Sequence, residues 1–460
     1  MKIVLIRPPD VGLGKYKEMS QGQHPVNLLF LAGYIQPRHE PVILDLQAVH
    51  MNKEQVSQYL KNQNPDAVGI SFMTCNFDSV KEIADMAKEL GKLVILGGPH
   101  PTILPKQTLE EINADIVIKN EGEITLKEVL DAAEDKKSLD GIKGIAFKKD
   151  GKIIDNAIRP FVENLDDLPV PDRRLLDLKH SRGATTTGVA KDSTVMFTSR
   201  GCAFQCIFCS ARLIHGNRYR SRSMDHIFKE IDQIKELGFE HISIEDDNFT
   251  FSNNRVEEFC ERIKPYGITW DVQARVGIPL DVLKKMKDAG CVKVAFGVES
   301  GSPRVLDVIK KHINLDGITD TFRNCRKAGI KTLAFFMVGH PTETKEDIGM
   351  TLNLIKKIKP DYLFVSLATP YPGTPLYDHM MEKGFIEKFD WSKFSFFGQD
   401  VEWRTENFNK EELIKLRSDM YKKFYMSPGY IFKSISEVRS VGDLKQLIQG
   451  AKVLFSFTKK

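Results

Sequence analysis

The sequence predicts an α/β protein: an N-terminal Rossmann-like sheet, a (β/α)6 partial TIM barrel and a small helical C-terminal region. Along the 460 residues, short apolar runs alternate with helix-like segments, as in parallel sheets covered by helices. Hydrophobic residues make up 42% of the chain and charged residues 28%, which suits large cores in a soluble protein. We expect a first domain over 1–140, a linker over 141–190, the barrel over 191–385 and the C-terminal region over 386–460.

Five short apolar runs predict the strands of the first domain. They cover residues 2–6, 41–46, 67–72, 92–96 and 115–118. A helix is predicted over 78–90, because its apolar residues recur on one face. Ligands of such sheets bind beyond the carboxyl ends of the strands. The candidate contacts there are Ser71 and Thr74 after the third run, Gly97, Gly98 and His100 after the fourth, and Glu121 and Gly122 after the fifth.

The linker has three parts. Residues 144–156 predict a small hairpin, and the Pro- and Asp-rich run 164–173 marks a domain boundary. Residues 179–192 are small and polar without periodicity, and we expect a mobile loop near the active site there.

Six further runs predict the barrel strands, at 194–198, 241–244, 268–273, 292–296, 332–338 and 362–367. Helices are expected between them, for example over 225–237 and 255–263. Barrel chemistry lies at the carboxyl ends of the strands. The polar residues at those ends are Glu245, Asp246 and Asp247 after the second strand, Arg275 after the third and Glu299 after the fourth.

Three cysteines follow the first barrel strand with the spacing C-x3-C-x2-C: Cys202, Cys206 and Cys209. A cubane 4Fe–4S cluster takes four ligands, so three thiolates leave one iron open to a small molecule. A zinc site with His215 as its fourth ligand is the alternative. The other four cysteines, Cys75, Cys260, Cys291 and Cys325, are expected to be small buried hydrophobes.

This spacing, with Phe208 just before the last cysteine, resembles the radical S-adenosylmethionine (radical SAM) superfamily. The resemblance implies a 4Fe–4S cluster on the three cysteines, with the open iron chelated by S-adenosyl-L-methionine. It also suggests how the strand-end residues bind that cofactor. Glu245, Asp246 and Asp247 would accept hydrogen bonds from the methionine ammonium, Arg275 would pair with its carboxylate, Glu299 would hold the ribose diol and Phe208 would lie against adenine. The alternative for Glu299 and Asp246 is a helix cap.

Taken in order, the strand-end residues of the first domain look like the cobalamin-binding domain fused to many radical SAM enzymes. The usual D-x-H-x-x-G signature, which supplies a histidine to cobalt, is absent, and His100 stands in a different context. We therefore expect cobalamin without a protein histidine on its lower face. The alternative is a degenerate flavodoxin-like module that binds no ligand.

Over most of its length the chain thus resembles the cobalamin-dependent radical SAM enzymes, a class with C- and P-methyltransferases and the anaerobic porphyrin-ring cyclase. The resemblance implies methylation of an unactivated carbon or phosphinate centre through methylcobalamin and a 5′-deoxyadenosyl radical. It implies a small-molecule or lipid/porphyrin substrate and an external flavodoxin- or ferredoxin-like electron donor. Two alternatives stay open: cyclisation or rearrangement without net methyl transfer, and a non-catalytic cobalamin or iron–sulfur sensor. No catalytic residue is assigned.

Bulk properties bear on location and partners. We expect a cytoplasmic protein, because there is no signal peptide or long apolar segment and the seven cysteines form no regular framework. The net charge of +4 is too small to suggest nucleic acid. A helix is expected over 411–425, and the final forty residues carry a net +6 with apolar residues at helical spacing over 444–455. These last residues fit either a helix packed on the barrel or a peripheral membrane contact.

Overall fold

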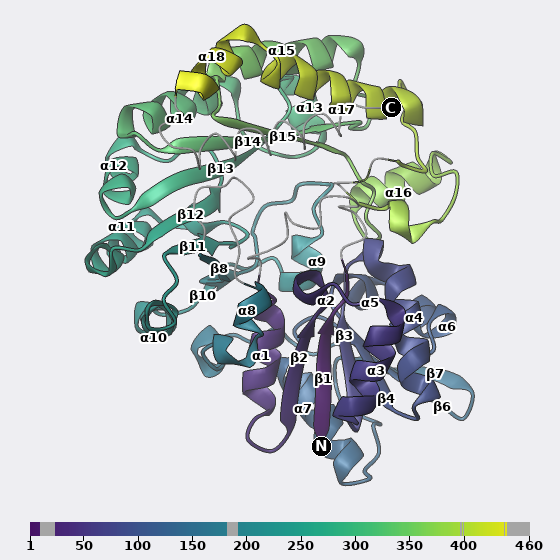
Figure 1. The fold of residues 1–460 in the computed structure, drawn as a ribbon. Helices are drawn as coiled ribbons and strands as arrows, with labels where there is room; N and C mark the ends of the chain where they lie inside the picture. The colour runs from purple at the N-terminus through teal and green to yellow at the C-terminus, as the bar shows by residue number, and fades with distance from the viewer. Residues whose placement is uncertain (10–23, 182–191, 396–397, 399, 437, 439–460) are drawn as a thin grey trace.

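The computed structural model describes residues 1–9, 24–181, 192–395, 398, 400–436 and 438 (Figure 1). Two sheets, one in each half of the chain, form the predicted α/β architecture, which is confirmed. Most of the predicted loop over 179–192 and the apolar pattern over 444–455 lie outside the described residues.

The first sheet has seven strands in the order β2-β1-β3-β4-β5-β6-β7. They are β1 (Lys2–Arg7), β2 (Glu40–Asp45), β3 (Ala67–Ser71), β4 (Leu93–Gly97), β5 (Ile116–Ile118), β6 (Ile145–Lys149) and β7 (Lys152–Asp155). The first five strands are parallel and coincide with the five predicted runs. The hairpin β6–β7 pairs antiparallel with β5, so this sheet continues past residue 140, where we expected the domain to end. A two-stranded hairpin is marginal alone, and here it completes the edge of β5.

Helices cover both faces of the first sheet (Figure 1). On one face lie α1 (Val26–Ile35) and α7 (Glu123–Glu134); on the other lie α3 (Lys53–Gln63), α4 (Phe77–Glu89) and α6 (Pro105–Glu111). The short helices α2 (Leu46–Val49) and α5 (Pro99–Ile103) follow β2 and β4 directly. The predicted apolar face of α4 is buried against the sheet, because residues three and four apart share one side of a helix.

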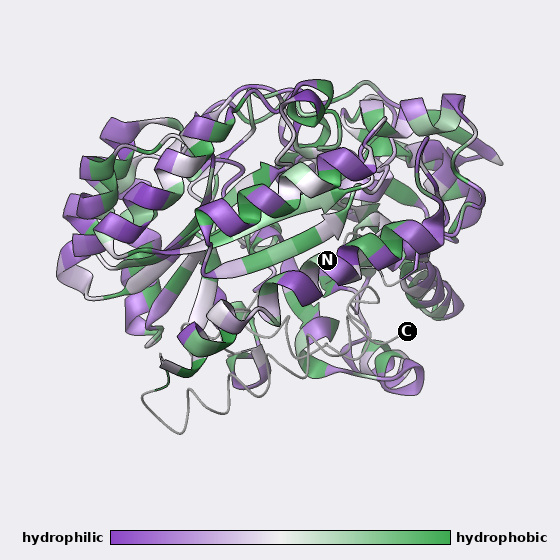
Figure 2. Cartoon of the chain, turned by 90° about the horizontal axis from the view of Figure 1, so that it is seen from above, coloured by the Kyte–Doolittle hydropathy of each residue, from purple (hydrophilic) through white to green (hydrophobic). Residues whose placement is uncertain are grey.

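The second sheet consists of six parallel strands in the order β15-β14-β13-β12-β11-β8, as predicted for a partial barrel. They are β8 (Ser193–Met196), β11 (His241–Ile244), β12 (Thr269–Ala274), β13 (Cys291–Glu299), β14 (Lys331–Val338) and β15 (Tyr362–Leu367). The covering helices are α10 (Met224–Glu236), α11 (Asn253–Ile263), α12 (Leu280–Asp288), α14 (Leu315–Ala328) and α15 (Lys345–Ile358), with the short α13 (Pro303–Val308) before α14. Figure 2 shows hydrophobic residues concentrated on the strands beneath helices of mixed character. One large apolar core lies between these layers.

The outer edge of the barrel sheet is closed by α17 (Lys410–Tyr425), which overlaps the helix expected over 411–425. The hydroxyl of Tyr421 accepts from the amide of Val365 at 2.9 Å and donates to its carbonyl at 3.1 Å. Tyr425 makes the same pair of contacts with Leu363 at 3.0 and 2.8 Å. The two hydroxyls therefore satisfy backbone groups that an edge strand would otherwise expose. The last described helix is α18 (Pro428–Ser436).

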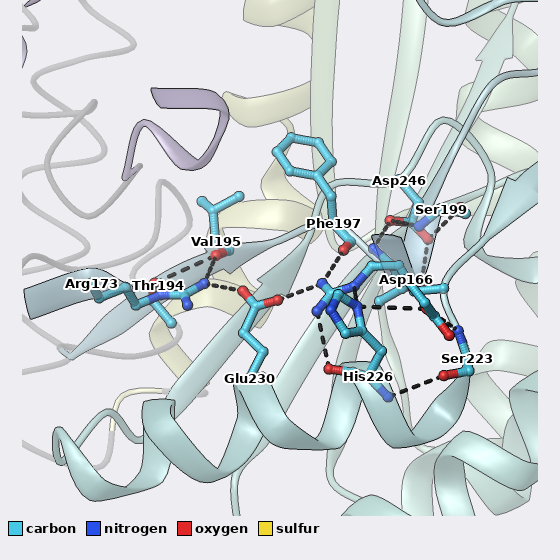
Figure 3. A network of polar contacts seen from close by, with 12 residues as sticks. Asp166, Arg173, Thr194, Val195, Phe197, Ser199, Ser223, His226, Glu230 and Asp246 are labelled. Atoms are coloured by element: carbon cyan, nitrogen blue, oxygen red, sulfur yellow. Dashed lines mark hydrogen bonds and ion pairs between the residues drawn. The ribbon is translucent and has the colours of Figure 1, made fainter. Parts of the chain in front are cut away.

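The linker is tied to the barrel by a buried ion network (Figure 3). Glu230 of α10 accepts from Arg173 of the linker at 2.7 Å and also pairs with Arg222. Arg173 also donates to the hydroxyl of Thr194 on β8 at 2.7 Å. The side chains of Arg173 and Glu230 are completely buried. Removing either charge would leave the other unpaired in the interior, which strongly destabilises the folded state.

After α16 (Pro375–Glu382) the chain returns to the first domain. Trp391 and Phe394 join the apolar core beside α4. The ring of Trp391 lies 5.3 Å from that of His100, edge to face. The two domains are therefore joined at this side by apolar packing.

Candidate functional site

The three cysteines lie in a loop framed by a small ribbon. Strand β9 (Ser199–Arg200) leads into the loop and pairs antiparallel with β10 (Arg220–Ser221), which follows it. At Gly201, φ is +90°, and an added Cβ would lie 2.2 Å from the carbonyl oxygen of Arg218, so only glycine fits there. All three cysteines are free of disulfides; Cys202 and Cys206 are half-buried and Cys209 is exposed. The loop can thus offer three thiols to one cluster.

The donor set is three thiols on one loop, and in a cubane each thiolate binds a different iron. In the described part of the chain, no three His, Cys, Asp or Glu side chains converge as the ligands of one metal ion would. The predicted zinc alternative needs His215 as a ligand. Its Nδ1 lies 3.1 Å from a carboxylate oxygen of Asp247, a contact that leaves Nε2 available, so this alternative stays a prediction.

The acidic residues after β11 have separate roles. Asp246 is buried and accepts from the amide of Thr198 at 2.6 Å, from the amide and hydroxyl of Ser199 at 3.2 and 2.6 Å, and from the hydroxyl of Thr198. These contacts occupy both of its oxygens and fix the strand that leads into the cysteine loop. We predicted that Asp246 would bind the methionine ammonium, and this stays a prediction. In the structure its oxygens accept from backbone amides and hydroxyl groups that the local sequence did not reveal.

Asp247 and Glu245 flank that residue. Asp247 accepts from the amide of Gly201 at 3.0 Å, next to the first cysteine. Burial by itself would raise the pKa of Asp247, but the hydrogen bond and charge of His215 lower it below its usual value. Glu245 accepts from the side-chain amide of Gln273, and burial together with the charge of Asp271 raises its pKa to about 7. Glu245 and Asp247 thus remain candidate acceptors for a cation.

Glu299 ends β13 in a strained conformation. Its φ is +65°, at a point where the pairing with β14 shifts register. Such strain persists where the surroundings hold a side chain in a required place. The carboxylate accepts from Nζ of Lys311 at 2.8 Å, and a Cβ at Gly297 would lie 2.5 Å from the Glu299 oxygen, so the glycine makes room for this pair.

Phe208 precedes Cys209 in the loop, and Arg275 contacts the loop from the end of β12. Nζ of Lys311 lies 6.0 Å from the ring centroid of Phe208. The guanidinium carbon of Arg275 lies 3.6 Å from the ring centroid of Phe204 in the cysteine loop, a cation–π contact. Arg275 also donates to the carbonyl of Lys311. The cysteine loop, Arg275, Phe208 and Glu299 are therefore gathered around Lys311.

Three residues of this region were missed by the sequence analysis: Lys311, His340 and Glu343. His340 is fully buried with its ring 6.3 Å from that of Phe208, and burial lowers its pKa to about 4, so the imidazole is neutral. Glu343 accepts from the amides of Gly339 and His340 at 2.7 and 3.3 Å. The polar run Gly339–Thr344 at the carboxyl end of β14 could have indicated His340 and Glu343, whereas no local sequence pattern indicates Lys311.

In the first domain, the predicted contacts gather at the carboxyl ends of β3, β4 and β5. At Gly98, φ is +98°, and an added Cβ would lie 2.7 Å from backbone atoms of Phe72. Only glycine therefore allows these two stretches of backbone to lie so close together. Gly97 ends β4, and the hydroxyl of Ser71 accepts from the side-chain amide of Asn27 at 3.0 Å. His100 is buried with Nδ1 3.3 Å from the hydroxyl of Thr74, and burial lowers its pKa to about 4.

Glu121 and Gly122 follow β5, and Gly122 is the N-cap residue of α7. Glu121 contacts the cysteine loop rather than open space. Its carboxylate accepts from Arg220 at 2.9 and 3.1 Å, from Arg200 at 3.1 Å and from the amide of Val162 at 2.7 Å. Burial alone would raise the pKa of Glu121, but the Arg220 hydrogen bond and the Arg200 charge lower it. Its contact with cobalamin stays a prediction, and in the structure Glu121 forms an ion network between the two domains.

Comparison with known proteins agrees with this arrangement. Residues 196–355 match the family model for the radical SAM superfamily, and residues 18–130 match the B12 binding domain. The chain is 34% identical over 445 residues to an uncharacterized methyltransferase from Pyrococcus horikoshii, covering 95% of both chains. It is 27% identical to the anaerobic magnesium-protoporphyrin IX monomethyl ester cyclase of Cereibacter sphaeroides, over 93% of this chain and 70% of the cyclase.

A solved structure has the same fold over almost the whole chain. The cobalamin-dependent S-adenosylmethionine radical enzyme OxsB, with aqua-cobalamin and S-adenosylmethionine bound, matches with a TM-score of 0.76 at 18% identity. The match covers 99% of this chain and 71% of that one.

The fold, the cysteine loop and these relatives define one class: the chain belongs to the cobalamin-binding radical SAM enzymes. It is a methyltransferase-like enzyme with cyclases among its relatives, and its cofactors are a 4Fe–4S cluster, S-adenosyl-L-methionine and cobalamin. Within the described chain, none of the helices combines the length and apolar character needed to cross a bilayer.

Proposed function

We propose that the protein methylates an unactivated carbon or phosphinate centre of a small molecule. When bound, the cluster and cobalamin supply the chemistry: the first generates the 5′-deoxyadenosyl radical and the second carries the methyl group. The observation that carries the proposal is the direct pairing of Glu121, at the end of β5, with Arg200, two residues before the first cysteine. This contact brings the strand ends of the first domain against the cysteine loop, as transfer between two cofactors requires.

The chain's own residues would bind and orient the cofactors. Cys202, Cys206 and Cys209 would hold the cluster. For S-adenosyl-L-methionine, we propose Glu245 and Asp247 for the ammonium, Arg275 for the carboxylate, Glu299 for the ribose diol and Phe208 for adenine. For cobalamin, we propose the strand-end residues Ser71, Thr74, Gly97, Gly98 and Gly122, with His100 behind them. We keep 1–140, 141–190, 191–385 and 386–460 as the proposed domain limits, with the β6–β7 hairpin of the linker completing the sheet of the first domain.

The methyltransferase relative, similar over 95% of both chains, favours methylation. The porphyrin cyclase relative supports a second candidate, radical cyclisation or rearrangement without net methyl transfer. A porphyrin-like or lipid substrate, and a flavodoxin- or ferredoxin-like electron donor, belong to both candidates. The non-catalytic sensor is disfavoured because a sensor has no need of Glu245, Arg275 and Glu299 around the cysteine loop.

Anaerobic reconstitution followed by a screen for labelled methyl transfer tests the proposal. The reduced protein is incubated with methyl-labelled S-adenosyl-L-methionine and fractions of small molecules, and products are examined by mass. Methylation adds one methyl group to a product, whereas cyclisation adds none. The triple variant Cys202→Ala, Cys206→Ala and Cys209→Ala is the control, since it should lose the iron–sulfur absorbance while staying folded. Retention of the cluster in that variant would contradict the cysteine assignment.

A further inference from the structure

The ribbon β9–β10, which frames the cysteine loop, contains an unfavourable pair. Arg200 and Arg220 are directly opposite each other across its two antiparallel strands. Like charges at opposed positions destabilise a sheet, and a ribbon of two residues per strand is marginal on its own. Something else must hold these two guanidinium groups together.

Glu121 supplies the missing charge from the other domain. It binds Arg220 with both oxygens, at 2.9 and 3.1 Å, and Arg200 at 3.1 Å. Glu123 adds a contact to Arg200 at 2.6 Å. The side chains of Glu121, Arg220 and Arg200 are 6, 7 and 13% exposed, so solvent screens the network little.

Aromatic rings restrict the two arginines further. Arg200 lies over Phe30 of α1, with 5.0 Å from the guanidinium carbon to the ring centroid. Arg220 lies over Phe161 of the linker at 5.1 Å. The planar guanidinium groups are therefore held both by the carboxylate fork and by ring faces. Glu121 is the carboxylate that contacts both arginines of the ribbon, whereas Glu123 contacts Arg200.

We propose that Glu121 is a positioning residue, which fixes the cluster loop at a set separation from the cobalamin-binding domain. The inference rests on the proposed function, because a fixed separation matters where a radical and a methyl group must meet. Glu121 touches neither reacting group; it acts through Arg200 and Arg220. Its loss should loosen the loop while the three thiols can still bind the cluster.

The test measures separation rather than turnover. Holo-protein is reconstituted anaerobically with iron, sulfide and hydroxocobalamin, and pulsed electron paramagnetic resonance gives the distribution of distances between Co(II) and the reduced cluster. The variant Glu121→Gln, isosteric but neutral, should show a wider or displaced distribution at unchanged iron and cobalt content. The matched control is Glu128→Gln, which removes an ion pair between α7 and Arg159 of the linker without touching the cysteine loop. It should match wild type.

A distribution for Glu121→Gln equal to that of wild type, with both cofactors loaded, would overturn the proposal. If the single variant does not fold, the double variant Glu121→Gln/Arg220→Gln removes both charges of the main pair and leaves Arg200 with Glu123. The double variant should also widen the distribution of distances. A distribution equal to that of wild type in the double variant would likewise overturn the proposal. Because no substrate is needed, this readout stays valid even if labelled methyl transfer is never found.

Discussion

Lys311 donates from Nζ to Oε1 of Glu299 at 2.8 Å, and each side chain is only 8% exposed. This pair holds a carboxylate next to Phe208 and the cysteine loop. We predict that Glu299→Ala weakens S-adenosyl-L-methionine binding in the cluster-loaded protein. Each charge-assisted hydrogen bond to the ribose diol would be worth about 1.5–3 kcal/mol. Anaerobic equilibrium binding measures the loss.

The control must separate binding from stability, because removing Glu299 also leaves a buried lysine without its partner. Lys311→Gln breaks the same ion pair but keeps the carboxylate. It should lower the free energy of unfolding and leave the cofactor affinity close to wild type. Equal affinity in wild type and Glu299→Ala would remove Glu299 from the cofactor site and favour a purely structural role.

The buried histidine of the first domain gives a second prediction. His100 is 1% exposed and packed among Phe72, Phe77 and Trp391, so its ring is not free to reach a cobalt ion. The Co(II) spectrum of bound cobalamin should therefore be the same in wild type and His100→Phe. Electron paramagnetic resonance of both proteins makes the comparison. A nitrogen hyperfine splitting that disappears in His100→Phe would show histidine ligation and contradict this account.

The linker network predicts a large effect on stability. Glu230 neutralises both Arg173 and Arg222 in the interior, and Figure 3 shows it on its helix next to Arg173 of the linker. Glu230→Gln should lower the free energy of unfolding by about 3–5 kcal/mol, because two buried charges lose their partner. Urea unfolding of the apo-protein measures this loss in the free energy of unfolding. The control is Glu163→Gln, whose ion pair with Arg218 is 3.5 Å long and exposed; a loss of similar size there would contradict the argument.

The fourth prediction concerns pH. Glu343 is 1% exposed, and burial raises its pKa from the ordinary 4.5 to about 8. Between these two values the folded state holds a proton that the unfolded state has released, so this group makes stability fall as pH rises. Glu343→Gln cannot ionise and should gain thermal stability relative to wild type between about pH 5 and about pH 8.5. A difference in melting temperature that stays constant with pH would refute the assignment.

Local patterns in the sequence were enough to locate the strands. The run 241–244 coincides with β11, and all six barrel runs and the first five sheet runs became strands, because buried parallel strands need continuous apolar residues. The cysteine loop and the polar strand ends followed from the same alternation. The hairpin at 144–156 was also predicted, but its pairing with β5 was not, since register between segments is not encoded in either segment alone.

What the sequence missed were partners far apart in the chain. Glu121 meets Arg200 across 79 positions, and Asp246 meets Thr198 across 48. A strand-end carboxylate looks the same in sequence whether it faces a ligand or a backbone amide. Lys311 has no local signal at all, because its role arises only when the chain after β13 folds back beside Glu299. Tertiary placement, not residue type, decides which partners these carboxylates contact.

The central claim is most directly tested with S-adenosyl-L-methionine alone, labelled in its methyl group. We predict that the anaerobically reconstituted and reduced protein transfers the label to its bound cobalamin and also forms 5′-deoxyadenosine, and that the triple cysteine variant forms none of the latter. Both products are separated and quantified by liquid chromatography with mass detection. Formation of 5′-deoxyadenosine with no label on cobalamin would contradict methyl transfer and favour the cyclase alternative. Absence of both products in wild type with all cofactors loaded would contradict the enzyme assignment itself.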